Sequence, residues 1–363
     1  MPESREGGNV GLKILHSADW HLDSPFASFA PEDGDYLRRF SRRIPGEVAQ
    51  LCRREGCDLM LLSGDLFDGP YTQESLTELR EALKYAGVPV FIAPGNHDYV
   101  GANSPWTEEA WPDNVHIFTG SLEYVDVPEL EVRVWGAGYR SMDCPPLLED
   151  FHAGEGPKYQ VGVLHGDAGA TASPYCPVTA AQVKQSGLKY LALGHIHRAD
   201  GFRAGDTLCA WPGCPMGRGW DETGEKGVLV VTLGEDTALR PVKLDMPCFY
   251  AFQTEIGEDP AAALEKLLPP AGEGNYYRVT LTGRGKVDTA ALAEQFRRYP
   301  RLELIDRTRP PVDLSALSGE DTLRGVYFGK LLALTKEPDC ASAARLAGEI
   351  SLDILEGREV VLP

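Results

Sequence analysis

Five short apolar stretches in the first two hundred residues each lead into a turn that carries aspartate, asparagine or histidine. The stretches span residues 13–16, 58–62, 88–93, 160–164 and 188–193. Each predicts a buried strand, because it is too short for a confident helix and turn residues follow it. The polar residues behind these strands are Asp19, His21, Asp65, Asn96, His97, His165, His195 and His197. Working residues of open α/β sheets lie where strands end, so the pattern predicts an α/β fold with one site at its strand ends.

The residue types in this series are those that bind a divalent cation at a mixed oxygen and nitrogen site. One of them alone would more often be a loop residue or a hydrogen-bonded core histidine. Five strand ends in a row favour a cation site, and no histidine follows His197. One carboxylate can bridge two cations. The seven residues of this series other than His97 therefore suit two ions that share a hydroxide and bind a phosphoryl oxygen. His97, next to Asn96, is then the candidate to assist the leaving group.

Length and composition predict a two-domain protein of the cytoplasm. The chain has 363 residues, which is more than one average domain. It has no apolar run long enough to span a bilayer, and residues 1–9 lack the apolar core of a signal peptide. The eight cysteines form no Cys-x-x-Cys pair and are interpreted as core or loop residues of a reducing compartment.

The net charge of −19 disfavours strong autonomous binding to a polyanion, but the charge is unevenly spread. Residues 275–310 carry eight Lys or Arg against four Asp or Glu. Arg297, Arg298 and Arg301 lie in this basic stretch and are candidate substrate contacts. A small-substrate enzyme has no evident use for such a patch, so the charge pattern favours DNA as the substrate.

The order of predicted elements divides the chain into four parts. Residues 1–10 are predicted to be a disordered leader, and residues 11–247 a domain of two mixed sheets flanked by helices. Residues 248–310 contain a small βαβ module, with strands over 276–282 and 302–306 and a helix over 288–299. Residues 311–363 form a C-terminal helical segment, with helices over 321–335 and 341–356.

The two C-terminal helices carry apolar residues at helical spacing. These residues are Leu323, Tyr327, Leu331 and Leu334 on the first helix and Leu346, Ile350 and Ile354 on the second. Phe328 and Leu332 lie off the first stripe and add apolar surface beyond what a small hairpin needs. The sequence leaves open whether the helices dock a partner or pack on the core.

Five motifs, in order, resemble those of the calcineurin-like metallophosphoesterases. They are Asp19-Trp20-His21, Gly64-Asp65 with Asp68, Gly95-Asn96-His97-Asp98, His165-Gly166 and Gly194-His195-Ile196-His197. The string from Leu15 to Phe26 and parts of residues 211–227 are similar to the DNA repair exonuclease branch, the SbcD and YhaO type. The resemblance covers about residues 11–235. It implies a four-layer α-β-β-α sandwich, extended by the small βαβ module as a cap and by the C-terminal helical segment.

The resemblance also implies the roles of individual residues. The first metal would be held by Asp19, His21, Asp65 and His197, and the second by Asp65, Asn96, His165 and His195. The implied ions are Mn²⁺, although Zn²⁺ or Fe²⁺ would suit the same ligands. His97 takes the role of the catalytic histidine.

The sequence leaves the roles of three further residues open. Some relatives carry histidine where this chain has Asp68, which leaves a substrate or supporting role for Asp68 undecided. His16, inside the first strand, is interpreted as a core residue or as support for a ligand. Arg218 is either a contact to a substrate phosphate or a surface arginine.

The function predicted from these features is that of a two-metal DNA repair nuclease working beside an SbcC-like ATPase. In this branch the corresponding module caps the site and guides DNA. One alternative is a phosphodiesterase for a small nucleotide or another small phosphodiester on the same metal core. The other, from a different class, is an inactive scaffold subunit of an ATPase complex, which intact residues at every motif disfavour. The sequence leaves open whether the protein forms a homodimer and whether it is an exonuclease or an endonuclease.

Overall fold

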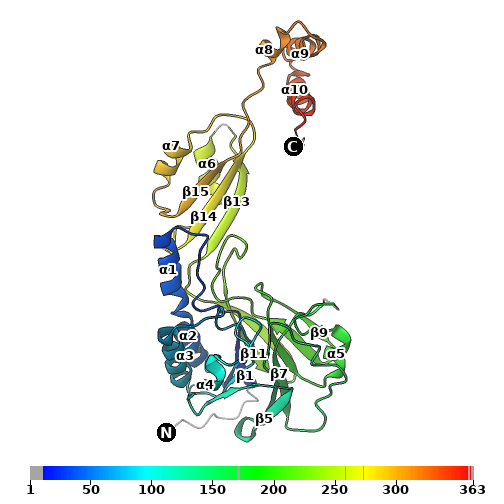
Figure 1. Ribbon diagram of the computed structural model, residues 1–363. Helices are drawn as coiled ribbons and strands as arrows, with labels where there is room; N and C mark the ends of the chain where they lie inside the picture. The colour runs from blue at the N-terminus through cyan, green and yellow to red at the C-terminus, as the bar shows by residue number, and fades with distance from the viewer. Residues whose placement is uncertain are drawn as a thin grey trace. The chain divides into compact units, whose positions relative to one another are not determined.

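The computed structural model describes residues 11–108, 110–169, 172–257, 259–272, 274–358 and 360. The predicted disordered leader, residues 1–10, therefore lies outside the described residues. The chain forms two compact units, one of residues 1–250 and 274–276, the other of residues 251–273 and 277–363 (Figure 1). Within the described ranges, no helix combines the length and apolar character that crossing a bilayer requires.

The first unit contains two six-stranded sheets. The first sheet has the order β12-β11-β1-β2-β3-β4. Its strands are β1 (Leu12–Ser17), β2 (Leu59–Leu62), β3 (Val90–Ile92), β4 (Val115–Ile117), β11 (Gly227–Leu233) and β12 (Thr237–Lys243). β1 to β4 run parallel, whereas β11 pairs antiparallel with both β1 and β12.

The second sheet has the order β5-β6-β7-β8-β10-β9. Its strands are β5 (Glu123–Val127), β6 (Val132–Gly136), β7 (Tyr159–His165), β8 (Tyr190–Gly194), β9 (Asp200–Ala204) and β10 (Thr207–Trp211). β6, β7, β8 and β10 run parallel, and the edge strands β5 and β9 are antiparallel to their neighbours. In each sheet the four parallel strands therefore end at the same side of the sheet.

Alternation of side chains along the strands places the two sheets face to face. Ile14, Leu61 and Phe91 of the first sheet are buried in one cluster with Val161 and Ala192 of the second. Because successive strand residues point to opposite faces, their neighbours face the outer layers. The predicted pair of mixed sheets is confirmed.

Helices cover the outer faces of the sandwich. On the first sheet, Leu15 and Leu62 pack in a cluster with residues of α1 (Pro31–Ser41), α2 (Ile44–Glu55) and α3 (Gln73–Ala86). On the second sheet, Leu191 and Leu193 pack with Val183 of α5 (Ala180–Gln185). The remaining helices of this unit are α4 (Pro105–Glu108) and the 3₁₀ helix η1 (Pro128–Leu130). The layer order is α-β-β-α, as expected.

The second unit is built around a three-stranded sheet of order β13-β14-β15. Its strands are β13 (Phe249–Glu255), β14 (Tyr276–Thr282) and β15 (Leu302–Asp306), with helices α6 (Pro260–Leu267) and α7 (Thr289–Gln295). β14 and β15 are parallel and α7 connects them, so the expected βαβ unit is present. α7 ends four residues earlier than the predicted helix, because Pro300 disfavours helical conformation just before it.

The described residues of the C-terminal part of this unit form three helices, α8 (Leu314–Ser318), α9 (Leu323–Leu334) and α10 (Ala341–Leu355). The predicted apolar stripe of the first long helix is wrong in part. Phe328 and Leu331 are buried against Leu314, whereas Leu323 is 87% exposed. The reason is that α8, which was not predicted, packs on α9. It buries the face of α9 that carries Phe328.

Candidate metal centre

The loops that follow five strands bring the predicted ligands together. Three sets of ligand atoms each lie within 4.8 Å of one another: Asp19, His21 and His197; Asp19, Asp65 and His165; and His21, Asp68 and His97. β1, β2 and β3 of the first sheet and β7 and β8 of the second lead into these residues. The site is therefore built from the strand ends of both sheets.

Several residues of the site have positive φ angles, which residues other than glycine seldom adopt. Asp19, Asp65 and His195 have φ values of 54°, 51° and 89°. The amide of Asp19 donates a hydrogen bond to the Gly64 carbonyl at 3.0 Å, which fixes two of the loops together. A Cβ on Gly95 would lie 2.2 Å from Oδ1 of Asp65, so glycine is required there. Strained backbone of this kind is stable only where many surrounding contacts hold it in place.

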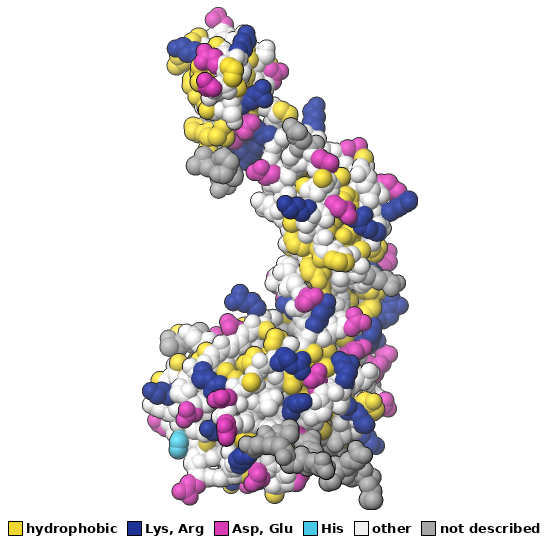
Figure 2. All heavy atoms as spheres, turned by 180° about the vertical axis from the view of Figure 1, so that it is seen from behind, with side chains coloured by type: hydrophobic (Ala, Val, Ile, Leu, Met, Phe, Trp, Pro, Cys, Tyr) yellow, Lys and Arg dark blue, Asp and Glu magenta, His cyan; other side chains and the backbone are white. Residues whose placement is uncertain are grey.

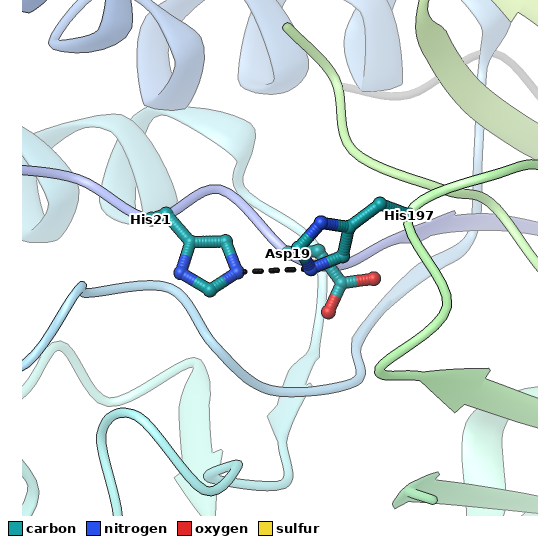
Figure 3. Close-up of side chains that lie close together, drawn as sticks. All are labelled: Asp19, His21 and His197. Atoms are coloured by element: carbon teal, nitrogen blue, oxygen red, sulfur yellow. Dashed lines mark hydrogen bonds between the residues drawn. The ribbon is translucent and has the colours of Figure 1, made fainter. Parts of the chain in front are cut away.

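His21 and His197 point their Nε2 atoms at each other across 3.2 Å, with the Asp19 carboxylate beside them (Figure 3). Nδ1 of His21 donates to Asp68 at 3.1 Å, and Nδ1 of His197 donates to Glu222 at 2.6 Å. Because a carboxylate only accepts, the Nδ1 atoms carry the protons and two Nε2 lone pairs converge. A divalent cation would satisfy both lone pairs.

A second group of acceptors converges on His165. Its Nδ1 donates to the Ser63 carbonyl at 2.9 Å, and its Nε2 lies 2.9 Å from Oδ1 of Asn96 and 3.3 Å from Oδ2 of Asp65. Burial opposes a charge on this ring, but Asp65 and Asp19 outweigh burial and raise the pKa of His165 to about 9. The carboxylates thus attract positive charge to this position, and a bound cation would supply it.

The chemistry of this donor set fits divalent metal ions. Burial raises the pKa of Asp19, and its Oδ2 is buried without a hydrogen-bond partner. Buried polar atoms are otherwise almost always paired, so this oxygen is suited to a metal. Two carboxylates, an amide oxygen and imidazole nitrogens are ligands that Mn²⁺, Zn²⁺ and Fe²⁺ accept.

His195 lies at the edge of the same cluster. Its ring centre is 5.3 Å from that of His165 and 4.7 Å from that of Tyr175, and its amide donates to Asp19 at 2.9 Å. Burial and the neighbouring His165 lower its pKa to about 4. His195 is thus a neutral imidazole, the form in which histidine binds metals.

Asp68 joins His97 to the cluster. Its Oδ1 accepts hydrogen bonds from Nδ1 of His21 at 3.1 Å and from Nδ1 of His97 at 2.9 Å. The bond to Asp68 raises the pKa of His97. His97 is about two-fifths exposed, unlike the buried His21, so it is open to a substrate.

Arg218 lies in the site and is not a surface arginine. Its Nη2 is 3.1 Å from Nδ1 of His197 and 3.0 Å from Oε1 of Glu222, and its Nη1 is 3.9 Å from Asp68. Glu222 orients both His197 and Arg218, a role that the sequence alone does not predict. Its position in the string Glu222-Thr223-Gly224-Glu225-Lys226-Gly227 is the signal that could have indicated it.

His16 belongs to the core that supports the site. Its two ring nitrogens bond to the hydroxyls of Tyr190 and Ser63, each at 2.7 Å. Burial lowers the pKa of His16 to about 3, so it stays neutral. The backbone carbonyl of the same Ser63 accepts the hydrogen bond from Nδ1 of His165, so His16 helps to hold the segment against which His165 lies.

The predicted DNA contacts lie in the second unit. Arg297 pairs with Glu294 at 3.3 Å, and Arg298 pairs with Glu265. Arg301 leads into β15, and its carbonyl accepts a hydrogen bond from the Tyr277 amide at 2.9 Å. The first two are exposed but already face carboxylates.

Comparison with known proteins identifies the family. Residues 12–199 match the family described as calcineurin-like phosphoesterase. The chain is 32% identical over 237 residues to the uncharacterized metallophosphoesterase YhaO of Bacillus subtilis (strain 168), a span of 61% of this chain and 57% of that protein. The chain thus spans little more than half of this relative.

Two nuclease relatives are more distant. The D subunit of the nuclease SbcCD of Staphylococcus epidermidis is 22% identical over 311 residues, which is 75% of this chain and 79% of that protein. The DNA double-strand break repair protein Mre11 of Aeropyrum pernix is 26% identical over 270 residues, which is 68% of this chain and 64% of that protein. Since the family match covers more than half of the chain, the chain belongs to the calcineurin-like phosphoesterase family, hydrolases that act on phosphoester bonds.

Proposed function

We propose that this protein is a two-metal phosphodiesterase that cleaves DNA. The observation that carries the proposal is the pair of acceptor groups that converge beside one carboxylate. Oδ2 of Asp65 lies 3.3 Å from Nε2 of His165 and 3.8 Å from Nε2 of His21. A carboxylate between two imidazole nitrogens is suited to bridge two cations.

The two ions would be held by the predicted ligand sets. Asp19, His21, Asp65 and His197 would hold the first, and Asp65, Asn96, His165 and His195 the second. We propose Mn²⁺ as the native ion, with Zn²⁺ and Fe²⁺ as alternatives that the same ligands accept. Two bound cations would lower the pKa of a water molecule and neutralise charge on a phosphoryl group.

The other residues of the site act on the substrate. Asp68 holds Nδ1 of His97, which leaves Nε2 of His97 to give a proton to the departing oxygen. The hydrogen bond to Asp68 raises the pKa of His97, which favours the form that carries this proton. The guanidinium of Arg218, held by Glu222, would bind a phosphate oxygen by charge-assisted hydrogen bonds.

DNA as the substrate is supported by the names of the two nuclease relatives. By the same likeness we propose a role in DNA repair, an SbcC-like ATPase as partner and a cytoplasmic location. The eight free cysteines are consistent with a reducing compartment.

A small phosphodiester is the second candidate, and one observation favours it. Cations of the basic stretch are paired with carboxylates: Arg278 with Glu303 at 2.8 Å, Arg284 with Asp353 at 2.7 Å, and Arg298 with Glu265. Paired cations release fewer counterions when they bind DNA. An assay that offers both substrate classes therefore distinguishes the two candidates.

The test measures metal content and hydrolysis together in wild type, Asp65→Asn and Asp126→Asn. Asp126 is the control, because it is an exposed acid paired with Arg133 on β5 and β6. Each protein is stripped with a chelator, reloaded with Mn²⁺, and given single-stranded DNA, double-stranded DNA and an aryl phosphodiester. We expect wild type and Asp126→Asn to bind two ions per chain and cleave DNA. Asp65→Asn should lose both ions and all hydrolysis.

Two results would contradict the proposal. Full metal occupancy in Asp65→Asn would show that this carboxylate does not bridge the ions. Hydrolysis of the aryl diester without cleavage of either DNA would favour the small-substrate alternative.

A further inference from the structure

A cavity of about 610 Å³ opens beside His97 in the first unit. It lies between two loops, one after β2 and one after β3. The residues that shape it are Pro70, Tyr71, His97, Tyr99, Gly101 and Asn103. Its volume falls within the range of roughly 300–1,000 Å³ that small-molecule sites have.

The loop that forms one wall is fixed to the core at several points. The carboxylate of Asp98 accepts hydrogen bonds from the amides of Gly95 and Leu66, each at 2.7 Å. The amide of Val100 donates to the carbonyl of Tyr139 at 2.8 Å. Trp106 donates its indole proton to the Asp98 carbonyl. The wall is therefore preformed, which lowers the entropy cost of binding a ligand.

The chemistry of the walls suits a flat aromatic ring and not an anion. Among the described residues that line the cavity there is no lysine or arginine. Two tyrosines line it instead, and the ring of Tyr71 packs against that of Phe67, with 5.6 Å between ring centres. Tyr99 is 38% exposed, so part of its ring surface is open to a ligand.

Gly101 lets the Tyr99 ring lie close against the loop. A Cβ at Gly101 would lie 3.2 Å from Cε2 of Tyr99, a tight contact that would require the ring to shift slightly. The Asn103 amide, on the same loop, offers both a donor and acceptors for the polar edge of a ring. A stacking surface with one amide group is a common way to bind a nucleobase.

We infer that this cavity binds the nucleobase carried by the leaving side of the scissile phosphate. The inference rests on the proposed function, because His97 is the group that faces the leaving oxygen. A phosphodiester held at His97 has its leaving nucleoside next to the wall formed by Tyr99. Stacking then holds that nucleoside in the bound complex and so tightens binding of the substrate.

The test uses a dinucleotide with two thymines and two analogues in which one sugar or the other lacks its base. The product without a phosphate identifies the leaving nucleoside. The proteins are wild type, Tyr99→Ala, Tyr99→Phe and, as a matched control, Tyr85→Ala, since Tyr85 is an exposed tyrosine on α3. Saturation-transfer NMR with free thymidine and metal-free protein gives a second readout.

We expect Tyr99→Ala to raise KM for the full dinucleotide by about 5- to 10-fold, the lower range of one base–aromatic stack, with kcat unchanged. For the analogue that lacks the leaving-side base, wild type and Tyr99→Ala should have the same KM. Tyr99→Phe and Tyr85→Ala should behave as wild type. Saturation transfer to the thymine protons should be seen with wild type and be absent with Tyr99→Ala.

Each contrary result has a distinct meaning. Equal KM changes with and without the leaving-side base, or transfer to thymidine unaltered in Tyr99→Ala, would overturn the assignment of the cavity. No cleavage of any dinucleotide by manganese-loaded wild type would contradict the proposed function, and the NMR titration would still decide whether the cavity binds a base.

Discussion

Asp68 is a single acceptor shared by two imidazoles with different tasks. The same Oδ1 holds Nδ1 of the buried His21 and Nδ1 of the more exposed His97. Burial favours the neutral acid, but the two histidine bonds outweigh it and hold the pKa of Asp68 well below its usual range. One charged carboxylate therefore orients a candidate metal ligand and the candidate proton donor together.

His97→Ala should leave both metal ions bound and lower turnover. The loss should depend on the leaving group, because a proton donor matters most for a poor leaving group. We expect a small loss with an acidic phenol and a loss of about 10²- to 10⁴-fold with a nucleotide. Metal content and kcat on both substrates are measured. Equal losses on the two substrates would argue against leaving-group assistance.

Glu222→Gln should weaken one metal site and spare the other. Removing this charge loosens the 2.6 Å bond that sets the proton on Nδ1 of His197. Loss of such an outer partner typically costs about 10- to 100-fold in metal affinity. In a titration with a chelator, one of the two ions should then be released at a lower chelator concentration than the other. Glu225→Gln, at an exposed glutamate paired with Lys243, is the control. Release of both ions together would contradict this assignment.

At the scale of elements, the C-terminal helices carry more apolar surface than their own packing uses. Leu323 is 87% exposed and Ile354 is 62% exposed, although both are large apolar side chains. Hydrophobic side chains are visible at the surface of this segment, at the top of the view (Figure 2). Exposed apolar residues on neighbouring helices are typical of a protein-binding face.

If the proposed SbcC-like ATPase docks on this segment, replacing Leu323 and Ile354 by glutamate should abolish its capture and leave hydrolysis of a small phosphodiester unchanged. Neither side chain is part of the buried cluster of Leu314, Phe328 and Leu331, so the segment should stay folded. Co-purification and circular dichroism check this. Glutamates at Met142 and Leu239, exposed apolar residues of the first unit, are the control. If the variant still co-purifies with the ATPase, the partner binds another surface of the protein.

The strands that carry the site could be predicted, whereas β5 and β9, the edge strands of the second sheet, could not. β1, β2, β3, β7 and β8 are fully or almost fully buried, so each appears as an apolar run. β9, with the sequence DGFRA, is largely exposed and has no such signal. Edge strands are often polar because their outer side faces water. α8 was missed because its five residues make less than two turns, too few to show a repeating helical pattern.

At the scale of the whole molecule, the uneven distribution of charge makes DNA binding measurable through its dependence on salt. The stretch 275–310 is basic in an acidic chain, yet several of its cations face carboxylates. Only phosphate contacts that replace bound counterions contribute to salt dependence. Affinity measured across salt concentrations therefore counts the cations that take part.

Arg297→Glu, Arg298→Glu and Arg301→Glu together should weaken DNA binding and flatten its salt dependence. The slope of log affinity against log salt should fall by about 0.9 for each phosphate that the protein no longer neutralises. Hydrolysis of a small diester should not change. The triple replacement of Arg53, Arg54 and Arg140 by glutamate, at exposed positions of the first unit, is the control, because it changes the net charge by the same amount. An unaltered slope would show that these arginines do not bind DNA.

Local sequence patterns were enough to determine which residues stand at the strand ends, because a buried strand and the turn after it are neighbours in the chain. They also determined the βαβ unit and the family resemblance. The tertiary structure alone decided which of those residues meet. His21 bonds to Asp68 across 47 positions of the chain, and it faces His197 across 176. Packing of the two sheets sets those distances, and no local pattern records how two sheets pack.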